Sequence, residues 1–295
     1  MNYRHQFHAG NFADVMKHAL LVQLVRALQK KERGFLCLDT HAGRGGYELA
    51  AAARGDSLAR KPEWPDGIGR LCGCPGLPPA LDDYLSLLHA FDARMTGPAP
   101  AGGPAGGPPR FYPGSPWLLR LLARPQERIV LCELQPDESL ALHAAFRGVP
   151  RLSVRETDGF AALRALLPPP EQRGLVLIDP PFEAQDEWRR IVEALGQALG
   201  RFPSGVFAIW YPLTQRARVD AFFAELRTLP LPPTLALELA IAAGSGALKM
   251  KGCGLVVLNP PWTFERTAEP MLHTLAGILA QEPGGGARAT WLVPE

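Results

Sequence analysis

Leu175-Val176-Leu177-Ile178 is a short apolar run, and Asp179-Pro180-Pro181-Phe182 follows it directly. A continuous apolar run of this length predicts a strand that is buried on both faces, as strands of parallel sheets are. Three other runs end in the same way: residues 35–38 before Asp39, residues 129–132 before Glu133, and residues 152–154 shortly before Asp158. Because the carboxyl ends of parallel strands meet at one edge of a sheet, we expect these acids to face a common crevice.

Helix-like segments alternate with these strands along the chain. Apolar residues recur every four positions from Phe12 to Leu28, and Asn11 with Asp14 resembles a helix start, so we predict an amphipathic helix over residues 12–30. A glycine turn, Gly43-Arg44-Gly45-Gly46, precedes residues 47–54, which have helix-forming composition. Later helices are predicted at residues 187–199, 215–226 and 271–280, and later strands at residues 206–211, 235–242 and 255–258. The alternation predicts a Rossmann-like α/β fold with a doubly wound, mostly parallel, seven-stranded sheet. An antiparallel strand among the last two is compatible with this prediction.

Residues 55–110 interrupt the alternation. They are rich in proline and glycine, and only residues 79–95 resemble a helix. Residues 97–109 consist only of glycine, proline and alanine, which predicts a mobile linker. We therefore expect a core of residues 1–54 and 111–295 with an inserted helical subdomain at 55–110. Ser115 before Pro116 predicts the cap of the helix that restarts the core.

The composition is that of a globular chain. Of the 295 residues, 47% are apolar and 20% charged, and the net charge is +2. The chain has no apolar run of about 18 residues and no apolar leader, so we expect a cytoplasmic protein that does not enter membranes. Five sparse cysteines indicate a reducing compartment, and Cys72-Gly73-Cys74 has no second ligand pair nearby, so we expect no metal.

The acidic strand ends bear on the cofactor. A dinucleotide is disfavoured because Glu48 stands where the third glycine of G-x-G-x-x-G is needed, and because a pyrophosphate is repelled by acids. S-adenosylmethionine fits better, since it carries a sulfonium, an ammonium, a ribose diol and an adenine amine. Glu133 is placed for the ribose hydroxyls and Asp158 for the amine. For each acid alone, a helix N-cap is the alternative interpretation.

Asp179-Pro180-Pro181-Phe182 is the sharpest chemical motif. Two consecutive prolines fix φ and hold the turn carbonyls rigidly, and the aromatic residue provides a flat wall for a planar base. Hydrogen bonds from an exocyclic amine to the Asp179 carboxylate and the Pro180 carbonyl would turn the nitrogen lone pair toward a sulfonium methyl group. Asn259-Pro260-Pro261-Trp262 matches the same pattern, but it follows a late strand, and we interpret it as a structural turn or the rim of the substrate cleft.

The chain also resembles the RlmJ family of 23S ribosomal RNA adenine-N6 methyltransferases over nearly its whole length. The segments that carry the resemblance are Tyr3-Arg4-His5-Gln6-Phe7-His8-Ala9-Gly10-Asn11, Asp39-Thr40-His41-Ala42-Gly43, Tyr112-Pro113-Gly114-Ser115-Pro116, Glu133-Leu134, Asp158-Gly159, Asp179-Pro180-Pro181, Trp210-Tyr211-Pro212 and Trp291-Leu292-Val293-Pro294-Glu295. The chain departs from the family in having Phe182 where tyrosine is more usual, and in its longer linker.

The resemblance implies a class I methyltransferase fold, S-adenosylmethionine as the methyl donor, S-adenosylhomocysteine as the product, 23S ribosomal RNA, free or as a precursor, as the partner, and a monomer. It assigns the catalytic role to Asp179 and a place near the substrate to Tyr3. Pro180 and Phe182 join Asp179 as predicted catalytic residues through the motif rather than through the resemblance. The residues to which it assigns the cofactor are His18, His41, Ser115, Glu133, Asp158, Gly159 and Asp179. His18 does not fall on the apolar stripe of its helix. Residues 3–18 mix basic and aromatic residues, as segments that contact RNA do. An ordinary surface helix can have the same composition.

Three other functions remain open on the sequence. The first is adenine-N6 methylation of DNA or tRNA, the second a noncatalytic RNA-binding factor on the same fold, and the third a nicotinamide dehydrogenase, which Glu48 disfavours.

Overall fold

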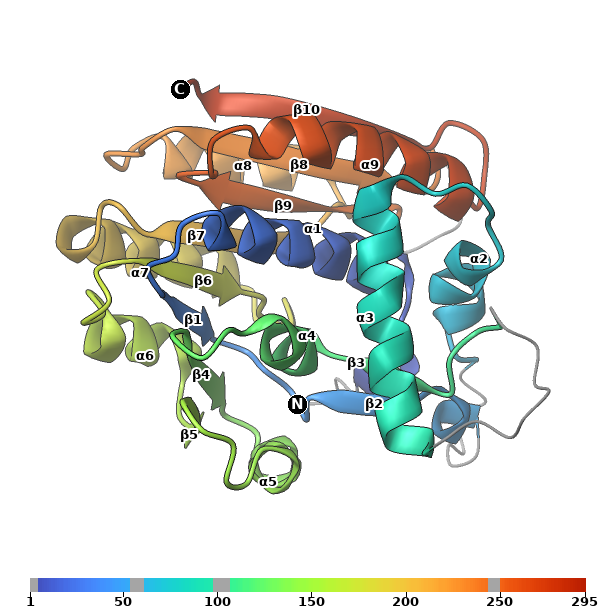
Figure 1. Ribbon diagram of the computed structural model, residues 1–295. Helices are drawn as coiled ribbons and strands as arrows, with labels where there is room; N and C mark the ends of the chain where they lie inside the picture. Colours follow the sequence, from blue (N-terminus) through green and yellow to red (C-terminus); the bar gives the residue numbers. More distant parts are fainter. Residues whose placement is uncertain (1–4, 54–60, 98–106, 244–249) are drawn as a thin grey trace.

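The computed structural model of the chain describes residues 5–53, 61–97, 107–243 and 250–295. Eight strands of this described part form one sheet, with β10 at one edge and β5 at the other (Figure 1). In their order across the sheet the strands are β10 (Gly286–Val293), β8 (Thr234–Ala240), β9 (Gly252–Leu258), β7 (Val206–Pro212), β6 (Gly174–Ile178), β1 (Leu36–Asp39), β4 (Arg128–Glu133) and β5 (Leu152–Glu156). The five strands from β5 to β7 are parallel, whereas β9 is antiparallel to β7 and β8, and β10 is antiparallel to β8. The α/β class and the mostly parallel sheet are confirmed.

Within the large sheet, β10 is the strand that the sequence did not predict, and it raises the number of strands in the described sheet from seven to eight. It follows a glycine run and begins Gly286-Ala287-Arg288-Ala289, residues of low strand propensity. As an edge strand it is only partly buried along most of its length, so it shows no strong apolar alternation.

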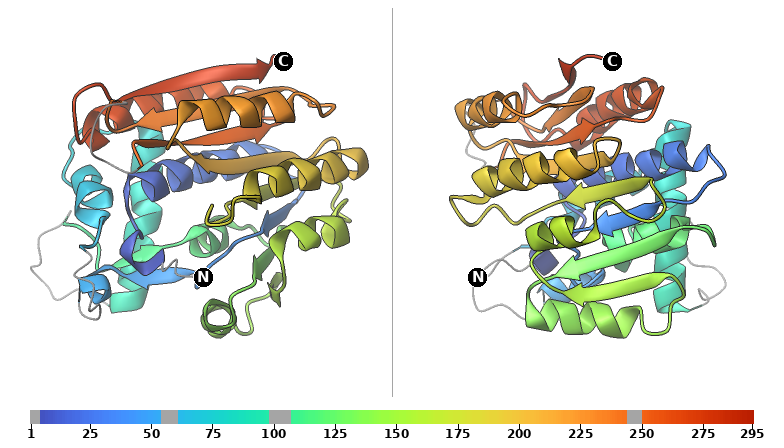
Figure 2. Two further views of the ribbon diagram at one scale, coloured as in Figure 1. Left: turned by 180° about the vertical axis from the view of Figure 1, so that it is seen from behind. Right: turned by 90° about the vertical axis from the view of Figure 1, so that its left-hand side faces the viewer.

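Helices cover both faces of the sheet (Figure 2). One face, in a single apolar cluster, carries α1 (Phe12–Gln29), α2 (Ile68–Cys72), α3 (Pro79–Thr96), α4 (Ser115–Leu122), α5 (Pro136–Ala145) and α9 (Phe264–Leu279). The other face carries α6 (Gly159–Leu166), α7 (Glu187–Arg201) and α8 (Arg216–Leu226). Short 3-10 helices are η1 (His5–Phe7), η2 (Leu49–Ala53) and η3 (Trp64–Asp66). No described helix combines the length and the apolar character that crossing a membrane requires.

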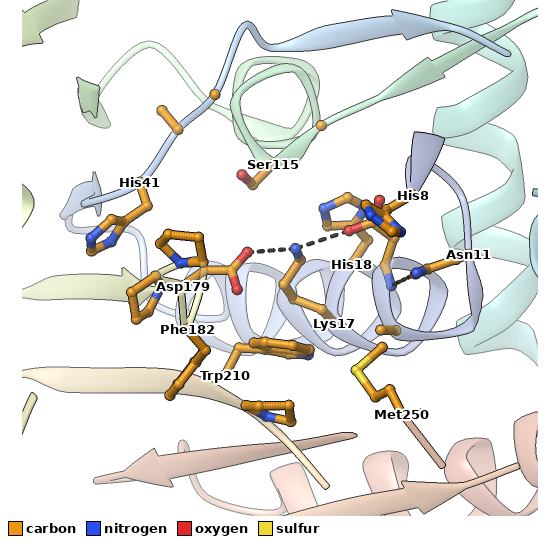
Figure 3. A pocket seen from close by; sticks show the side chains of 18 of the residues that line it. His8, Asn11, Lys17, His18, His41, Ser115, Asp179, Phe182, Trp210 and Met250 are labelled. Carbon is orange, nitrogen blue, oxygen red and sulfur yellow. Dashed lines mark hydrogen bonds and ion pairs between the residues drawn. The ribbon is translucent and has the colours of Figure 1, made fainter. Parts of the chain in front are cut away.

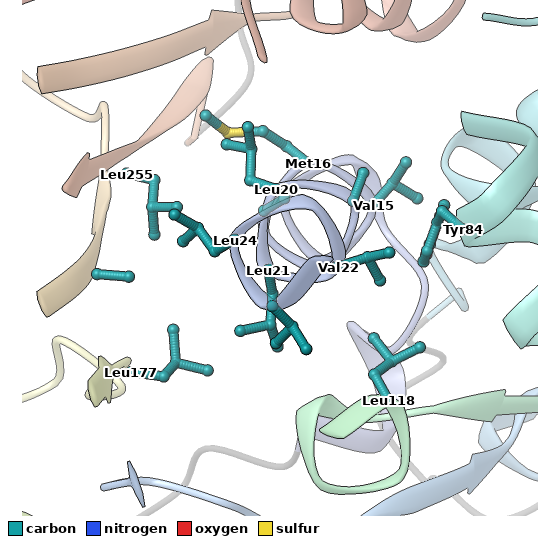
Figure 4. Close-up of a cluster of buried hydrophobic side chains, with 14 of the residues drawn as sticks. Val15, Met16, Leu20, Leu21, Val22, Leu24, Tyr84, Leu118, Leu177 and Leu255 are labelled. Carbon is teal, nitrogen blue, oxygen red and sulfur yellow. The ribbon is translucent and has the colours of Figure 1, made fainter. Parts of the chain in front are cut away.

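Helix α1 is a core helix rather than an amphipathic surface helix. Side chains that point in all directions from it, among them Val15, Leu20 and Leu21, are at most 1% exposed, and so is His18 (Figure 4). The expected apolar stripe with a polar face is therefore wrong for the first three turns. The reason is tertiary, because α1 packs against α3, α4, α9 and β9 at once. The predicted start is confirmed, since the Asn11 side chain accepts a hydrogen bond from the Asp14 amide at 3.0 Å.

Residues 47–54 were expected to be helical, and this is wrong for Tyr47 and Glu48. Gly46–Glu48 form strand β2, which pairs antiparallel with β3 (Phe111–Pro113) in a separate ribbon. The ribbon buries Tyr47 and Tyr112 in the core, and this burial outweighs the helix propensity of the segment. A side chain at Gly46 would collide with Phe91, because an added Cβ would lie 2.7 Å from its ring.

Helix α9 begins at Phe264, seven positions before the expected start at Met271. Pro270 lies inside the helix, and a proline inside a helical pattern ordinarily marks a boundary. The segment at residues 97–109, which was expected to be a linker, falls largely on residues 98–106, outside the described residues.

Candidate active site

A cavity of about 830 Å³ opens at the carboxyl ends of β1, β4 and β6, where the sequence places the acidic strand ends. Each described residue that was assigned to cofactor or catalysis lines it: His18, His41, Ser115, Glu133, Asp158, Gly159, Asp179, Pro180 and Phe182. Tyr3 lies outside the described residues. The cavity is also lined by residues 61–63 and Asp66, which belong to the segment expected to be an insertion.

Asp179 is held by a lysine that sequence reasoning did not assign to the site. Lys17 Nζ lies 2.5 Å from Asp179 Oδ2 and 2.9 Å from Asp14 Oδ1, and Figure 3 shows the lysine between the two carboxylates. The Lys17 side chain is 7% exposed. Burial alone would lower the pKa of Lys17, but the charges of Asp14 and Asp179 outweigh burial and raise it well above its usual value. The ammonium therefore stays charged and fixes one oxygen of Asp179.

Asp39 and Ser115 form a buried pair beneath this site. The Ser115 hydroxyl donates to Asp39 Oδ2 at 2.6 Å. Burial raises the pKa of Asp39 to about 7, and the nearby charge of Asp179 adds to the rise. The expectation that Ser115 caps its helix is wrong, because the cap position is Gly114, which makes no side-chain bond, and Ser115 is the first helical residue. The serine hydroxyl is used by Asp39 instead.

The glycine turn after β1 brings backbone against Glu133. Gly43 has φ of 59° and donates its N–H to Glu133 Oε2 at 2.8 Å, while Gln135 N donates to Oε1 at 2.8 Å. Burial raises the pKa of Glu133, although both N–H groups oppose the rise. Gly159 permits the next close approach, because an added Cβ would lie 2.1 Å from the Thr40 carbonyl oxygen.

His41 is neutral in this site. Burial lowers its pKa to about 4, and the carboxylates of Asp179 and Asp158 only partly oppose the fall. Its Nδ1 lies 2.8 Å from Thr40 Oγ1, whose proton is donated to the Leu177 carbonyl. We therefore assign the imidazole proton to Nδ1, which leaves Nε2 as an acceptor.

His18 is fixed by two tyrosines. Its Nδ1 lies 2.8 Å from the Tyr112 hydroxyl, which lies 2.8 Å from that of Tyr84, and the His18 ring stacks on Tyr112. This network joins α1, α3 and β3 below the cavity.

Phe182 belongs to an aromatic wall. It has φ of 53°, and its ring centroid lies 4.7 Å from that of Trp188 and 5.7 Å from that of Trp210. Trp210 also lines the cavity. The ring is therefore held beside Asp179 by packing.

Asp158 acts as the N-cap of α6, which was the alternative interpretation of this acid. Its Oδ1 accepts from the amides of Phe160 at 2.8 Å and Ala161 at 3.1 Å. Its Oδ2 accepts from Arg190 at 2.6 Å. Arg190 lines the cavity as well, and sequence reasoning missed it because it is one of two neighbouring arginines on α7.

Glu63 and Glu187 are among the cavity acids that sequence reasoning missed. Glu63 accepts at Oε2 from Asn11 Nδ2 at 2.8 Å and lies 3.0 Å from His8 Nδ1, so it ties residues 61–66 to the N-terminal segment. Glu187 is 5% exposed, and its Oε2 is buried without a hydrogen-bond partner among the described residues. Nothing in the sequence distinguished either acid from a surface residue.

Asn259 lies away from this cavity, which confirms its interpretation as a structural turn. Its side-chain amide donates to the carbonyls of Pro203 and Gly205, both at 2.8 Å. Because β9 is antiparallel to β7, Leu258 at the end of β9 pairs with Phe207 near the start of β7. Asn259 therefore lies at the end of the sheet opposite to Asp179.

The strand order with the antiparallel β9, the glycine turn after β1 and the acids that converge on one crevice define a Rossmann-like class I methyltransferase fold. Comparison with known proteins specifies this further. A family model described as "Ribosomal RNA large subunit methyltransferase D, RlmJ" matches residues 32–293. The chain belongs to the RlmJ family.

Two relatives are similar over their full length. Proteins named "Ribosomal RNA large subunit methyltransferase J" from Escherichia coli K12 and Haemophilus influenzae are each 36% identical over 295 residues, which cover all of both chains. A crystal structure of a Legionella pneumophila protein is 32% identical, with a TM-score of 0.81 over 96% of this chain and 97% of that chain.

Proposed function

We propose that this protein transfers the methyl group of S-adenosylmethionine to the N6 amine of an adenine in 23S ribosomal RNA. The observation that carries the proposal is the placement of Asp179-Pro180-Pro181-Phe182 in the cavity, with Lys17 bound to one oxygen of Asp179. Family membership supports the same reaction, because the full-length relatives are named as ribosomal RNA methyltransferases.

The cavity suits S-adenosylmethionine, which when bound supplies a methyl group on a positively charged sulfur. Carboxylates at Glu133, Asp158 and Asp179 line it, and they attract a cation and accept hydrogen bonds from hydroxyls and amines. The residues that we propose to hold the cofactor are His18, His41, Ser115, Glu133, Asp158, Gly159 and Asp179. The product is S-adenosylhomocysteine, and the proposal requires no metal.

Asp179 orients the target amine. Lys17 holds Oδ2, so Oδ1 is the oxygen left to accept one amine N–H, while the Pro180 carbonyl accepts the other. Phe182 stacks on the base and fixes its plane. This arrangement withdraws the nitrogen lone pair from conjugation with the adenine ring and points it at the methyl group. Alignment, rather than a strong base, then promotes attack of the nitrogen on the methyl group. Asp179 or water then takes the amine proton.

The RNA partner requires the target adenine to leave its stack and enter the cavity. We place Tyr3 near the substrate on the family resemblance alone. We also propose that the protein is a monomer that acts on free or precursor RNA.

We further propose that residues 55–110 are an insertion in a core of residues 1–54 and 111–295. The support is that β2 and β3, which flank the segment, pair with each other and bring its ends together. The pairing joins Glu48 to Phe111, close to the expected boundaries.

The test is methyl transfer from tritiated S-adenosylmethionine to three substrates in parallel. We expect incorporation into unmodified 23S RNA and not into tRNA or duplex DNA, with N6-methyladenosine in the nuclease digest by mass spectrometry. Incorporation into tRNA or DNA alone would show that 23S RNA is not the substrate. Absence of S-adenosylmethionine binding by calorimetry would favour a noncatalytic RNA-binding factor and would contradict the proposal.

A further inference from the structure

A second hollow, apart from the cavity of the active site, lies between α8, β8 and β10. Its volume is about 190 Å³, below the roughly 300 Å³ at which pockets for small organic ligands begin. In the left view of Figure 2, α8 lies in front of the edge of the sheet that β10 closes. The charged side chains that line the hollow are Arg216, Asp220, Arg227, Glu238 and Arg288. We call this site the α8 hollow, and its size and lining suit a small anionic group.

The side-chain alternation of β10 directs Arg288 into the α8 hollow. Ala287 and Ala289 pack on the apolar cluster that contains α1. Because successive side chains of a strand point to opposite faces, Arg288 points to the face that α8 covers. In the register of the sheet Arg288 is paired with Glu238 of β8, which lines the same hollow. The arginine is thus presented by the backbone of the sheet rather than by a loop.

Arg216 is held by both carboxylates of the hollow. Its Nη1 lies 2.8 Å and 2.9 Å from the two oxygens of Glu238, and its Nε lies 2.9 Å from Asp220 Oδ1. Glu238 is 9% exposed and also accepts from the Tyr211 hydroxyl at 3.0 Å. The Arg216 side chain remains 45% exposed. The two carboxylates therefore fix this guanidinium at the surface and are themselves occupied by it.

The other arginines of this surface have no such partners. Arg227 and Arg288 are exposed, and neither forms an ion pair with any residue that the structure describes. Arg218, two positions after Arg216, likewise has no ion pair within the described ranges, and its guanidinium lies 5.7 Å from the centroid of the Trp188 ring. The hollow and Arg218 thus combine four arginines with two carboxylates, an excess of two positive charges that equals the net charge of the whole chain. Cations held close together in this way attract an anion.

This charged surface continues from the wall of the active-site cavity. Thr214 lines that cavity, and α8 begins two residues later, at Arg216. Trp188, over which the Arg218 guanidinium lies, has its ring centroid 4.7 Å from that of Phe182 in the cavity wall. An RNA strand that leaves the slot of the target base on this side therefore reaches Arg218 and then the α8 hollow.

We propose that the α8 hollow and Arg218 bind phosphate groups of the RNA strand next to the target adenine. The inference rests on the proposed function, which supplies the RNA. Guanidinium groups suit phosphates because their planar N–H groups donate to two oxygens at once. Contacts to phosphates carry much of the affinity of a protein for nucleic acid without reading its sequence. Helix α8 thus holds the backbone of the strand while the base occupies the cavity.

The test removes the two arginines that have no ion pair. Arg227→Gln/Arg288→Gln lowers the net charge by two and breaks no ion pair of the described residues, so the fold should survive, which thermal melting checks. The matched control is Arg120→Gln/Arg147→Gln, which lowers the net charge equally. Both control arginines are exposed, at the ends of α4 and α5 that point away from the cavity. Filter binding of labelled, unmodified 23S RNA over a series of KCl concentrations measures the affinity.

We expect Arg227→Gln/Arg288→Gln to bind the RNA about tenfold more weakly, and the slope of log Kd against log salt concentration to fall by about 2, since two phosphate contacts are lost. The control should stay within about twofold of the native affinity, with the native slope. At saturating RNA, kcat of the double variant should stay within about threefold of the native value, because the cavity is untouched. Its affinity for S-adenosylhomocysteine, measured by calorimetry, should be unchanged.

The inference is overturned if the folded Arg227→Gln/Arg288→Gln protein binds 23S RNA with the native affinity and slope. It is also overturned if the control loses as much affinity, because overall charge then explains the effect. Calorimetry with inorganic phosphate tests a free anion as the occupant. If the native protein binds phosphate, the double variant does not, and both bind RNA equally, the hollow belongs to a free anion. In these three cases the proposed function stands. If the native protein binds no 23S RNA at all, the proposed function fails together with the inference.

Discussion

One four-residue pattern occurs twice in the chain, as Asp179-Pro180-Pro181-Phe182 and as Asn259-Pro260-Pro261-Trp262. The fold places the two copies at opposite ends of the strands of the same sheet. The first follows β6, which runs with its parallel neighbours, so it ends at the crevice. The second follows β9, which runs the other way. The direction of the preceding strand, rather than the pattern, decides which copy meets the cavity.

Their surroundings differ accordingly. Asp179 faces a buried lysine, whereas the Asn259 amide closes a turn by binding two backbone carbonyls. Phe182 packs against two tryptophans, whereas Trp262 is 74% exposed. Both turns contain a residue in the left-handed region, Phe182 at 53° and Asn259 at 51°. The pattern therefore encodes a turn, and the chemistry comes from what the turn faces.

The largest expected difference is between Asp179 and Asn259, the first residues of the two copies of the pattern. Asp179→Asn should lower kcat about a thousandfold, because Lys17 binds the one oxygen that remains and the side-chain NH2 group, a donor, then faces the amine where an acceptor is needed. Asn259→Ala should leave kcat within about twofold. Single-turnover methylation of 23S RNA measures both, with thermal melting as the check on folding. Equal losses in the two variants would show that the pattern itself, and not its location, carries activity.

The lysine that only the first copy faces gives the next effect. Lys17→Met should destabilise the protein by about 3 kcal/mol, because it leaves the buried carboxylate of Asp14 and the partly buried carboxylate of Asp179 without their cation. Lys30→Met, at the exposed end of the same helix, should change stability by less than about 0.5 kcal/mol. Urea unfolding measures both variants. A loss below about 1 kcal/mol in Lys17→Met would mean that the charge network contributes little.

The aromatic ends of the two copies give a smaller effect. Phe182→Ala should raise KM for RNA about tenfold through lost base stacking, and Trp262→Ala should leave KM unchanged. Steady-state methylation against a short RNA substrate measures this. If Trp262→Ala raises KM as much as Phe182→Ala does, RNA also contacts the turn that contains Trp262.

The smallest effect concerns Asp39, beneath the crevice. Its pKa of about 7 lies above the usual value, so the folded protein binds a proton more tightly there than the unfolded chain does, and stability falls as pH rises through 7. Between pH 6 and 8 this costs about 1 kcal/mol. Asp39→Asn cannot titrate, so its melting temperature should depend less on pH. Parallel pH profiles of the two proteins would contradict the assignment.

The sequence predicted the parts of the fold that rest on local signals. The four strands with acidic ends, the helices after them and the placement of Asp179 in a crevice follow from apolar runs and turn residues. The expected burial is confirmed for β1, β4 and β6 and is wrong for β5, which lies at the edge of the sheet and is partly exposed along its length. Family resemblance added His18 and Ser115, which lie at the cavity although composition gave them no special place.

The remaining features depend on contacts between distant segments. Lys17 looked like an ordinary helix residue until the fold placed Asp179 against it, 162 positions away. Tyr47 had helical neighbours, and its pairing with Tyr112 made it a strand residue. Ser115 looked like a cap, and Asp39 claimed its hydroxyl. In each case a partner far along the chain outweighed the local preference.

The all-round burial of α1 also sets an order of events during synthesis. Met16 contacts Cys253, which the ribosome adds 237 positions later. Until β9 and α9 emerge, the apolar side chains of α1 lack their final cover, so the nascent chain must remain soluble for most of its translation. We expect the newborn protein to need chaperone protection that the finished enzyme does not.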